Sequence, residues 1–252
     1  MKIESYGLTD VGKKRSRNED SFLVSPELNL YVVADGMGGH SGGEYASRLA
    51  VATMEEVIQS MNLDPDATVI SGVNSEGTEY GDRLKHAIDV AGQKIYDQAL
   101  YEPELKGMGT TITAMVIDEG GKAFVANVGD SRVYLVRSNN IEQITDDHSL
   151  VSEQMRAGLI RESDAKKHKL KNIITRSVGY QEEVEIDLHK IDYKTGDVFV
   201  LCSDGLTNMV DDTKILEIAS GNDPEQACRT LIDQANQNGG DDNVTVVICK
   251  VL

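Results

Sequence analysis

The stretch Val32-Val33-Ala34-Asp35-Gly36-Met37-Gly38-Gly39-His40-Ser41-Gly42-Gly43 decides how the chain is interpreted, because an apolar strand here delivers one carboxylate into a run of glycines before a helix. Glycine-rich backbone lets carbonyl oxygens and a carboxylate approach one point, as a site for a hard cation or a phosphate requires. The same pattern also suits a tight turn in which Asp35 merely caps the following helix. The choice depends on whether distant segments supply matching groups.

The composition is that of an acidic globular protein. The 252-residue chain carries 42 acidic and 25 basic residues, a formal charge of −17, which argues against nonspecific binding to nucleic acid or an anionic membrane. No apolar run approaches the ~20 residues of a membrane span, and no long apolar segment follows the N-terminus. We therefore expect a cytoplasmic protein without membrane insertion. A monomer is also expected.

Cysteine and histidine give no pattern typical of zinc or of a disulfide framework. The three cysteines are far apart and lie in apolar runs, which favours buried small hydrophobic side chains: Cys202, Cys228 and Cys249. The five histidines form no His-x-His or His-Glu-x-x-His pattern. A bound metal is therefore expected to have oxygen ligands.

The first part of the chain alternates strand and helix patterns. Strands are expected over 3–9, 21–24 and 28–34, the last two joined as a hairpin across Ser25-Pro26-Glu27. A helix with a capping box at Ser41-Gly42-Gly43-Glu44 follows, and a second helix is expected from about 83 to 100. The polar segment 62–81 between them is expected to be a surface loop.

The second part begins with strand patterns over 110–117, 122–128, 132–136 and 141–144, which predict one antiparallel meander. A Lys- and Arg-rich segment, 146–172, then interrupts the strands like an inserted flap. Strands over 184–192 and 197–202, helices over 212–220 and from Asp223-Pro224 onward, and a strand over 244–251 complete the chain.

These elements predict an α+β fold. Several strands are apolar at both odd and even positions, so both faces of their sheets should be covered. The pattern predicts a four-layer α-β-β-α sandwich, in which two mainly antiparallel sheets are stacked centrally between helix pairs. One domain, residues 1–252, is expected, with the flap subdomain inserted at 146–172.

Four more acidic segments lie, like Asp35, where a strand stops and the backbone turns. They are Asn18-Glu19-Asp20, Val128-Gly129-Asp130-Ser131-Arg132, Cys202-Ser203-Asp204-Gly205 and Gly239-Gly240-Asp241-Asp242-Asn243. Each alone is ordinary turn chemistry. Carboxylates gathered at one end of a sheet would repel unless cations neutralised them, and oxygen ligands favour Mg²⁺ or Mn²⁺ over zinc.

The ordered motifs of the chain closely resemble those of the bacterial branch of the metal-dependent type 2C protein serine/threonine phosphatases. The resemblance covers essentially the whole chain. It rests on Arg15-x-x-Asn18-Glu19-Asp20, Val33-Ala34-Asp35-Gly36-Met37-Gly38-Gly39, Gly109-Thr110-Thr111, Asn127-Val128-Gly129-Asp130-Ser131-Arg132, Leu201-Cys202-Ser203-Asp204-Gly205-Leu206 and Asp241-Asp242-Asn243-Val244-Thr245.

The resemblance implies a centre that holds two Mn²⁺ or Mg²⁺ ions. Asp35 would bridge both ions, and the Gly36 carbonyl would bind one of them. Asp204 and Asp242 would complete the shell of the other ion, while Glu19 would hold a metal-bound water.

Two further acidic positions receive roles by the same resemblance. Asp20 would orient the site from behind the metal ligands. Asp130, together with Asp204, matches a third and weaker metal position, although Asp130 also suits a turn carboxylate beside Arg132.

The expected reaction is direct hydrolysis of phosphoserine and phosphothreonine in proteins. Two cations about 3.5–4 Å apart can share a water, lower its pKa and clamp the oxygens of an in-line displacement at phosphorus. The predicted nucleophile is thus a metal-bridging hydroxide, and no phosphoenzyme forms. Arg15 matches the family's phosphate-clamping arginine and would offer a bidentate fork. Arg17 is the competing candidate, Arg15 is favoured by its register in the motif, and a solvated loop charge is the alternative for Arg15.

The proton donor to the leaving group is left open. Many eukaryotic members have a histidine directly after the Asp-Gly, whereas this chain has Met37. His40 is the candidate general acid, with a metal-bound water or a plain loop histidine as alternatives. His168 matches a flap histidine of bacterial members. The flap's cations suit recruitment of phosphorylated or acidic segments, or simply a solvated pair of helices.

The expected partners are phosphorylated proteins and a bacterial serine/threonine kinase that the enzyme opposes. A catalytically silent relative used as a binding or sensor module is disfavoured because Asp35, Asp204, Asp242 and Arg15 are all intact. An acidic Ca²⁺-binding structural protein is disfavoured because the chain has no Asp-x-Asp-x-Asp-Gly loop.

Overall fold

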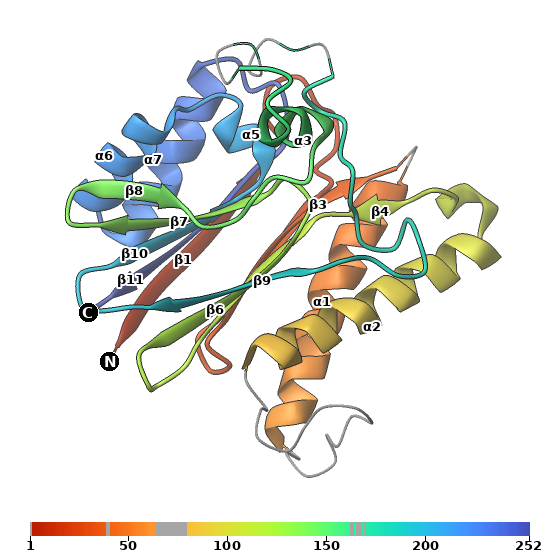
Figure 1. Cartoon of the computed structure of the whole chain (residues 1–252), viewed down its shortest axis with the longest axis horizontal. Helices are drawn as coiled ribbons and strands as arrows, with labels where there is room; N and C mark the ends of the chain where they lie inside the picture. The colour runs from red at the N-terminus through yellow and green to blue at the C-terminus, as the bar shows by residue number, and fades with distance from the viewer. Residues whose placement is uncertain (1, 39–40, 64–79, 162–163, 165–167, 169) are drawn as a thin grey trace.

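Two antiparallel sheets stacked face to face form the centre of the molecule (Figure 1). The computed structural model describes residues 2–38, 41–63, 80–161, 164, 168 and 170–252. Within this part, one sheet has the strand order β1 (Ile3–Asp10), β11 (Val244–Val251), β10 (Val198–Cys202), β7 (Arg132–Arg137) and β8 (Asn140–Gln143). The other has the order β2 (Asp20–Ser25), β3 (Leu30–Met37), β5 (Ile112–Ile117), β6 (Lys122–Val128) and β9 (Asp187–Asp192), with β4 (Gly109–Thr110) paired to β3.

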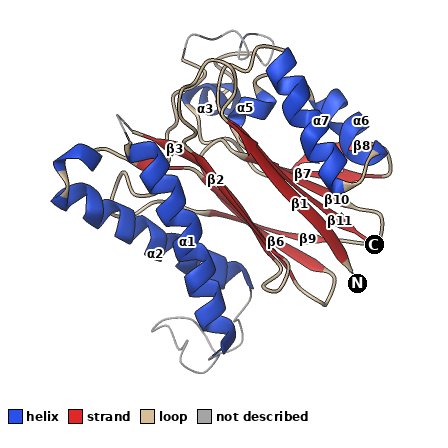
Figure 2. Cartoon of the chain, turned by 180° about the vertical axis from the view of Figure 1, so that it is seen from behind, coloured by secondary structure: helices blue, strands red, loops and turns tan. Residues whose placement is uncertain are grey.

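A pair of helices covers the outer face of each sheet (Figures 1 and 2). Helices α1 (Gly42–Leu63) and α2 (Tyr80–Tyr101) share one apolar core with β3, β5 and β6. Helices α6 (Asp212–Gly221) and α7 (Pro224–Gln237) share another with β7, β10 and β11. The four-layer α-β-β-α sandwich predicted from the sequence is thereby confirmed.

A third apolar core lies between the two sheets, which explains why the central strands are apolar on both faces. Its largest fully buried side chains include Tyr31, Met115, Phe199 and Leu201. Truncation of one such side chain typically costs ~2–5 kcal/mol, because a cavity is left in a close-packed interior. This middle core fixes the sheets face to face, so that strand ends from both sheets meet at a common edge.

The late helices begin where the capping residues predict. The Asp211 carboxylate accepts the backbone N–H of Lys214 at 2.9 Å, and the Asp223 carboxylate accepts that of Gln226 at 2.9 Å, with Pro224 in the first turn. The short helices η1 (Pro103–Leu105) and α5 (Asp204–Thr207) were not predicted. Most of the predicted loop, residues 64–79, lies outside the described residues.

The prediction of a single meander is wrong. Strands β5 and β6 pair in one sheet and β7 and β8 in the other, so the chain changes sheet at residues 129–131, the sheet crossover. Gly129 has φ +109°, and a Cβ there would lie 2.5 Å from Cγ2 of Thr111, so the crossover requires glycine. Strand periodicity predicts which residues are buried but not which sheet a strand joins, which explains the error.

Strand β3 also extends further than predicted. It continues past Asp35 because Gly36 pairs with Thr110, and Met37 pairs with Gly109. Asp35 lies opposite Asp20 of β2 in this antiparallel pair, so the two carboxylates are neighbours on one face of the sheet. Asp35 is therefore a strand residue, and the alternative of a turn carboxylate that caps the helix is wrong.

The predicted flap segment, residues 146–172, contains helix α3 (Leu150–Arg156), which the Ser149 hydroxyl caps by accepting the Ser152 N–H at 3.3 Å. Part of this segment lies outside the described residues. Figures 1 and 2 both place α3 and α5 at the end of the sheets where β3 stops. The flap segment is thus next to the edge that carries Asp35.

Candidate metal centre

The backbone of Asp35 is fixed on both sides by the segment that carries β4 and β5. Its N–H donates to the Thr111 hydroxyl at 2.9 Å, and its C=O accepts the Thr110 hydroxyl at 3.0 Å and the Thr111 N–H at 2.8 Å. The Asp35 side chain is half-buried at the open end of the sheet. The strand thus presents one carboxylate from a rigid backbone.

Gly36 is required by close packing. Its N–H donates to the Glu19 carbonyl at 3.1 Å, and a Cβ on Gly36 would lie 2.0 Å from the Gly43 carbonyl oxygen. No larger residue fits where β3, the start of α1 and the Glu19 segment meet. This contact ties the predicted ligands Asp35, Gly36 and Glu19 into one unit.

Asn243 joins the two ends of the chain at the site. Its side-chain oxygen accepts the backbone N–H of Glu19 at 2.8 Å, while its amide donates to the carbonyls of Val11 at 3.0 Å and Arg17 at 2.9 Å. Asn243 is almost fully buried, so these backbone groups have little water to replace its hydrogen bonds. The asparagine therefore holds the 11–19 segment against the start of β11.

Arg15 lies at the rim of the same edge. Its guanidinium donates to Asp242 at 2.7 Å, and about half of its side chain is exposed. Burial raises the pKa of the Glu19 carboxyl, and Arg15 and then Arg17 oppose this rise. Both arginines therefore lie near Glu19, and Arg15 also contacts a predicted metal ligand.

Asp20 is buried behind the other carboxylates. One of its oxygens accepts the hydroxyls of Ser203 at 2.7 Å and Thr245 at 2.6 Å. The other oxygen is buried and has no hydrogen-bond partner in the part of the chain that the structure describes. Burial raises the pKa of Asp20 to about 7, against the effect of the two hydroxyls, and repulsion from Asp204 and Asp242 adds to the rise.

Asp204 begins the short helix α5. The Asn208 amide donates to its carboxylate at 2.9 Å, and Lys171 of the flap segment donates to the side-chain oxygen of Asn208 at 3.1 Å. Burial, followed by repulsion from Asp242, raises the pKa of Asp204 to about 6. A contact chain thus connects the flap segment to a predicted metal ligand.

Asp130 lies on the sheet crossover and is 8% exposed. Burial raises its pKa to about 8, with further contributions from Asp204 and Asp147. Among the described residues, no other side chain donates a hydrogen bond to its carboxylate.

The carboxylates act on one another across the edge. Burial raises the pKa of Asp35 well above its ordinary value, and repulsion from four other aspartates adds to the rise: Asp20, Asp204, Asp130 and Asp242. Segments far apart in sequence thus bring their acidic groups together, as the spacing of the motifs predicted. The turn alternative for each does not explain this convergence.

The donor set fits a divalent cation. All the converging side chains offer oxygen, and one oxygen of the buried Asp20 has no partner among the residues that the structure describes. Within the described part of the chain, no three Asp, Glu, His or Cys side chains already enclose a single point. A divalent cation among these carboxylates would offset the repulsion that raises the pKa of Asp35.

Known proteins with similar sequence and fold show the family of the chain. The sequence pattern of protein phosphatase 2C matches residues 12–240. This chain belongs to the protein phosphatase 2C family. It is therefore a metal-dependent serine/threonine protein phosphatase, which confirms the family and the enzyme class predicted from the motifs.

Two relatives illustrate how much of this phosphatase is matched. The serine/threonine phosphatase stp of Listeria monocytogenes serovar 1/2a is 38% identical over 246 residues, 96% of this chain and 93% of that protein. Protein phosphatase PhpP of Streptococcus pneumoniae R6 is 36% identical over 248 residues, 97% of this chain and 96% of that protein.

Solved structures give the same result for the fold. The Mycobacterium tuberculosis serine/threonine phosphatase PstP/Ppp has a TM-score of 0.87 and 33% identity, covering 99% of this chain and 98% of that one. The PstP catalytic domain in complex with two manganese ions has a TM-score of 0.85 and 33% identity, and the match covers 99% of this chain and 98% of that one. The family uses divalent metals, as the oxygen-only donor set predicted.

Two candidate histidines of the phosphatase have different outcomes. His40 lies outside the described residues, so its role as general acid stays a prediction. His168 is in the flap segment, where its Nδ1 accepts the Leu170 N–H at 3.3 Å. Met37, which follows the Asp-Gly, has a half-buried side chain. Its backbone, at the end of β3, pairs with Gly109 of β4.

Several residues that support the phosphatase site were missed in the sequence. Asn243 and Asn208 hold a predicted ligand or its segment, and Ser203 and Thr245 hold Asp20 behind the predicted ligands. All of them except Asn208 lie within the quoted motifs, next to or near an aspartate. Their position beside motif aspartates was the available signal, but short polar side chains are common in loops.

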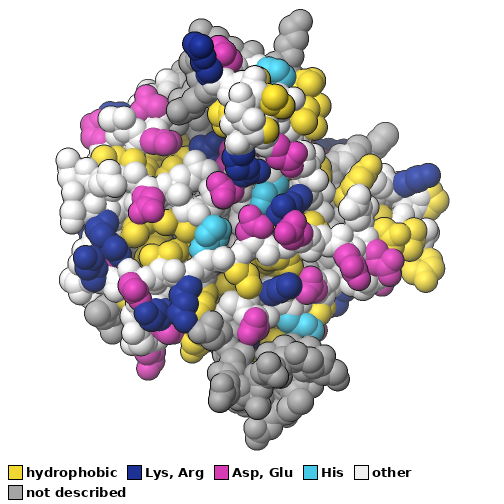
Figure 3. Space-filling view, viewed as in Figure 1, with side chains coloured by type: hydrophobic (Ala, Val, Ile, Leu, Met, Phe, Trp, Pro, Cys, Tyr) yellow, Lys and Arg dark blue, Asp and Glu magenta, His cyan; other side chains and the backbone are white. Residues whose placement is uncertain are grey.

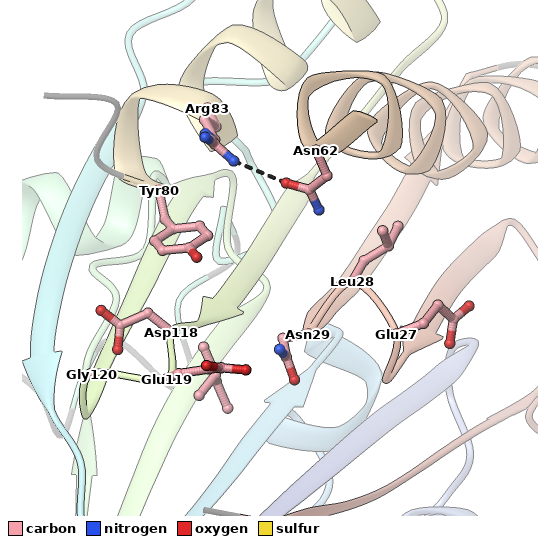
Figure 4. A pocket seen from close by; sticks show the side chains of 10 residues that line it. Glu27, Leu28, Asn29, Asn62, Tyr80, Arg83, Asp118, Glu119 and Gly120 are labelled. Carbon is pink, nitrogen blue, oxygen red and sulfur yellow. Dashed lines mark hydrogen bonds between the residues drawn. The ribbon is translucent and has the colours of Figure 1, made fainter. Parts of the chain in front are cut away.

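A hollow of about 440 Å³ lies at the other end of the phosphatase (Figure 4). It is lined by the β2–β3 and β5–β6 turns and by the facing ends of α1 and α2, where Arg83 donates to Asn62 at 2.9 Å. Because Asp35 and Asp20 lie at the opposite ends of their strands, this hollow is separate from the carboxylate edge.

Proposed function

We propose that the carboxylate edge is the catalytic centre, and that it hydrolyses phosphoserine and phosphothreonine in proteins. The observation that carries the proposal is the convergence of five aspartates, in which Asp20, Asp204, Asp130 and Asp242 all raise the pKa of Asp35. Asp35, the Gly36 carbonyl, Asp204 and Asp242 would hold two divalent cations, with Glu19 beside them. Asp130 and Asp204 would hold a third.

When bound, the cations supply Lewis-acid activation of water and neutralise charge on the phosphoryl oxygens. The side chains of the protein would bind the phosphate and orient the carboxylates of the site. Arg15, at the exposed rim beside Asp242, would bind two phosphate oxygens with its planar fork. Ser203 and Thr245 keep the Asp20 carboxylate turned toward the site.

Direct hydrolysis is supported by the position of the thiols. Cys202, Cys228 and Cys249 are all buried, and burial raises the pKa of each thiol. A protonated, inaccessible thiol is a poor nucleophile. The leaving alkoxide must take its proton from another group, for which His40 stays the predicted source.

The biological partners are also part of the proposal. The relatives named stp and PhpP are bacterial serine/threonine or protein phosphatases, which supports opposition to a bacterial serine/threonine kinase. Among the described residues, no helix is long and apolar enough to span a membrane. On the face drawn in Figure 3, acidic and basic side chains are interspersed. A cytoplasmic location, a monomeric state, a single domain and a choice between Mn²⁺ and Mg²⁺ stay predictions.

A phosphothreonine peptide tests the proposed function. The wild-type protein should release phosphate with Mn²⁺ or Mg²⁺ and lose this activity with a chelator. Asp204→Asn should lower kcat/KM at least about 100-fold, because a neutral amide is a weak ligand for a divalent cation. Full activity in excess chelator would contradict the proposal.

A further inference from the structure

His148 is a buried histidine whose two ring nitrogens both have polar neighbours. It lies at the start of the flap segment and is 2% exposed. Its Nδ1 accepts the backbone N–H of Gly129 at 3.1 Å, and its Nε2 lies 3.0 Å from the Asp187 carboxylate. Because a backbone N–H can only donate, Nδ1 carries no proton, and the ring proton is on Nε2 facing Asp187.

Asp187 is itself held in place. Arg176, at the exit of the flap segment, donates to the other Asp187 oxygen at 2.9 Å and lies 3.3 Å from Nε2 of His148. Arg176 also pairs with Glu185 at 2.8 Å. The orientation of the His148 ring is therefore fixed by groups on β9 and on the chain that leads into it.

The sheet crossover is held at both ends by consecutive residues. His148 binds Gly129 twice, because its own N–H also donates to the Gly129 carbonyl at 3.0 Å. On the other side, Arg132 makes two hydrogen bonds to the Asp147 carboxylate, at 2.8 and 2.7 Å. Asp130 lies between these two clamped positions.

Asp130 depends on this clamp for its position. Among the described residues, no other side chain donates to its carboxylate, so the backbone of the crossover sets where the carboxylate points. We propose that His148, in the tautomer fixed by Asp187, is a positioning residue that holds the Asp130 carboxylate for a divalent cation. This inference rests on the proposed function, because Asp130 is a metal ligand only there.

The two roles of the ring can be separated by substitution. In His148→Asn the side-chain oxygen takes approximately the place of Nδ1, so the acceptor for Gly129 is kept. In His148→Gln the amide reaches toward Nε2 and Asp187, and the acceptor for Gly129 is lost. His189→Gln is the matched control, because His189 lies on the same strand as Asp187 and its Nε2 has no hydrogen-bond partner among the described residues.

The first measurement is hydrogen–deuterium exchange over residues 126–133 in the metal-free, full-length protein. His148→Gln should increase the exchange rate of this segment about tenfold, whereas His148→Asn and His189→Gln should change it less than about twofold. The second measurement is isothermal titration with Mn²⁺. Asp130→Asn should abolish one Mn²⁺ site, and His148→Gln should lower the Mn²⁺ affinity of that same site about tenfold.

The outcomes are distinct. If exchange rises in His148→Gln while Mn²⁺ binding does not change, the histidine is merely structural and the proposal is overturned. If Asp130→Asn removes no Mn²⁺ from the wild-type stoichiometry, the ligand role assumed in the proposed function fails, even if exchange responds. Should His148→Gln not fold, ¹⁵N NMR of the wild-type protein decides: an unprotonated Nδ1 on His148 supports the proposal, and a protonated Nδ1 contradicts it.

Discussion

At the scale of single residues, the site depends on side chains that hold ligands as much as on the ligands. The acidic motifs could be recognised in the sequence because five segments carry an aspartate at a strand end, four of them with a glycine beside an aspartate. Asn243 could not be assigned, because its three backbone partners come from segments more than 200 residues away. Only the fold shows that such an asparagine joins the two ends of the chain.

The assignment of Arg15 rather than Arg17 is tested by matched alanine variants. Arg15→Ala should raise the KM for a phosphothreonine peptide about tenfold, because a charge-assisted fork to the phosphate is lost. Arg17→Ala should raise it less than about threefold. Steady-state kinetics at saturating Mn²⁺ measures both values. An equal or larger effect of Arg17→Ala would show that Arg17 is the phosphate clamp.

At the scale of elements, local sequence patterns predicted the position of most helices and strands. The final strand and the two late helices match their predicted starts because caps and apolar runs are local signals. The sheet change at Gly129 was missed because sheet membership is decided by packing between distant segments. The extension of β3 past Asp35 was missed for the same reason, since β4 completes it from about 70 residues away.

The contact between β3 and α1 predicts a sharp difference between two glycines. Gly36→Ala should lower the free energy of unfolding by at least about 2 kcal/mol, because its Cβ would overlap the Gly43 carbonyl. Gly221→Ala is the control: at the end of α6, no described atom lies within 4 Å of the Cβ that alanine would add, and a change within about 1 kcal/mol is expected. Urea unfolding measures both. Equal stability of the two variants would contradict the packing described for Gly36.

At the scale of the whole molecule, two sheets bring acidic strand ends to one edge, and this arrangement costs stability when no cation is bound. The layered architecture followed from strands that are apolar on both faces. The register that places Asp20 opposite Asp35 required the structure, because a one-residue slip moves every side chain to the other face.

Metal-free protein should lose stability as the pH rises. Burial and repulsion raise the pKa of Asp204 to about 6, of Asp20 to about 7 and of Asp130 to about 8. A carboxyl group with a raised pKa stabilises the fold fully below its unfolded pKa, and this stabilisation is lost as pH rises through the folded pKa. In chelator, Tm should therefore fall between about pH 5 and about pH 8.5, less so in Asp20→Asn. A Tm that rises over this interval in both proteins would contradict the described electrostatics.

The central claim is that the edge around Asp35 holds divalent cations. Anomalous diffraction at the manganese absorption edge, from crystals grown with Mn²⁺, tests it most directly because it locates the ions. Two strong peaks are expected among Asp35, the Gly36 carbonyl, Asp204 and Asp242. Well-ordered crystals in saturating Mn²⁺ with no peak at these residues would contradict the claim.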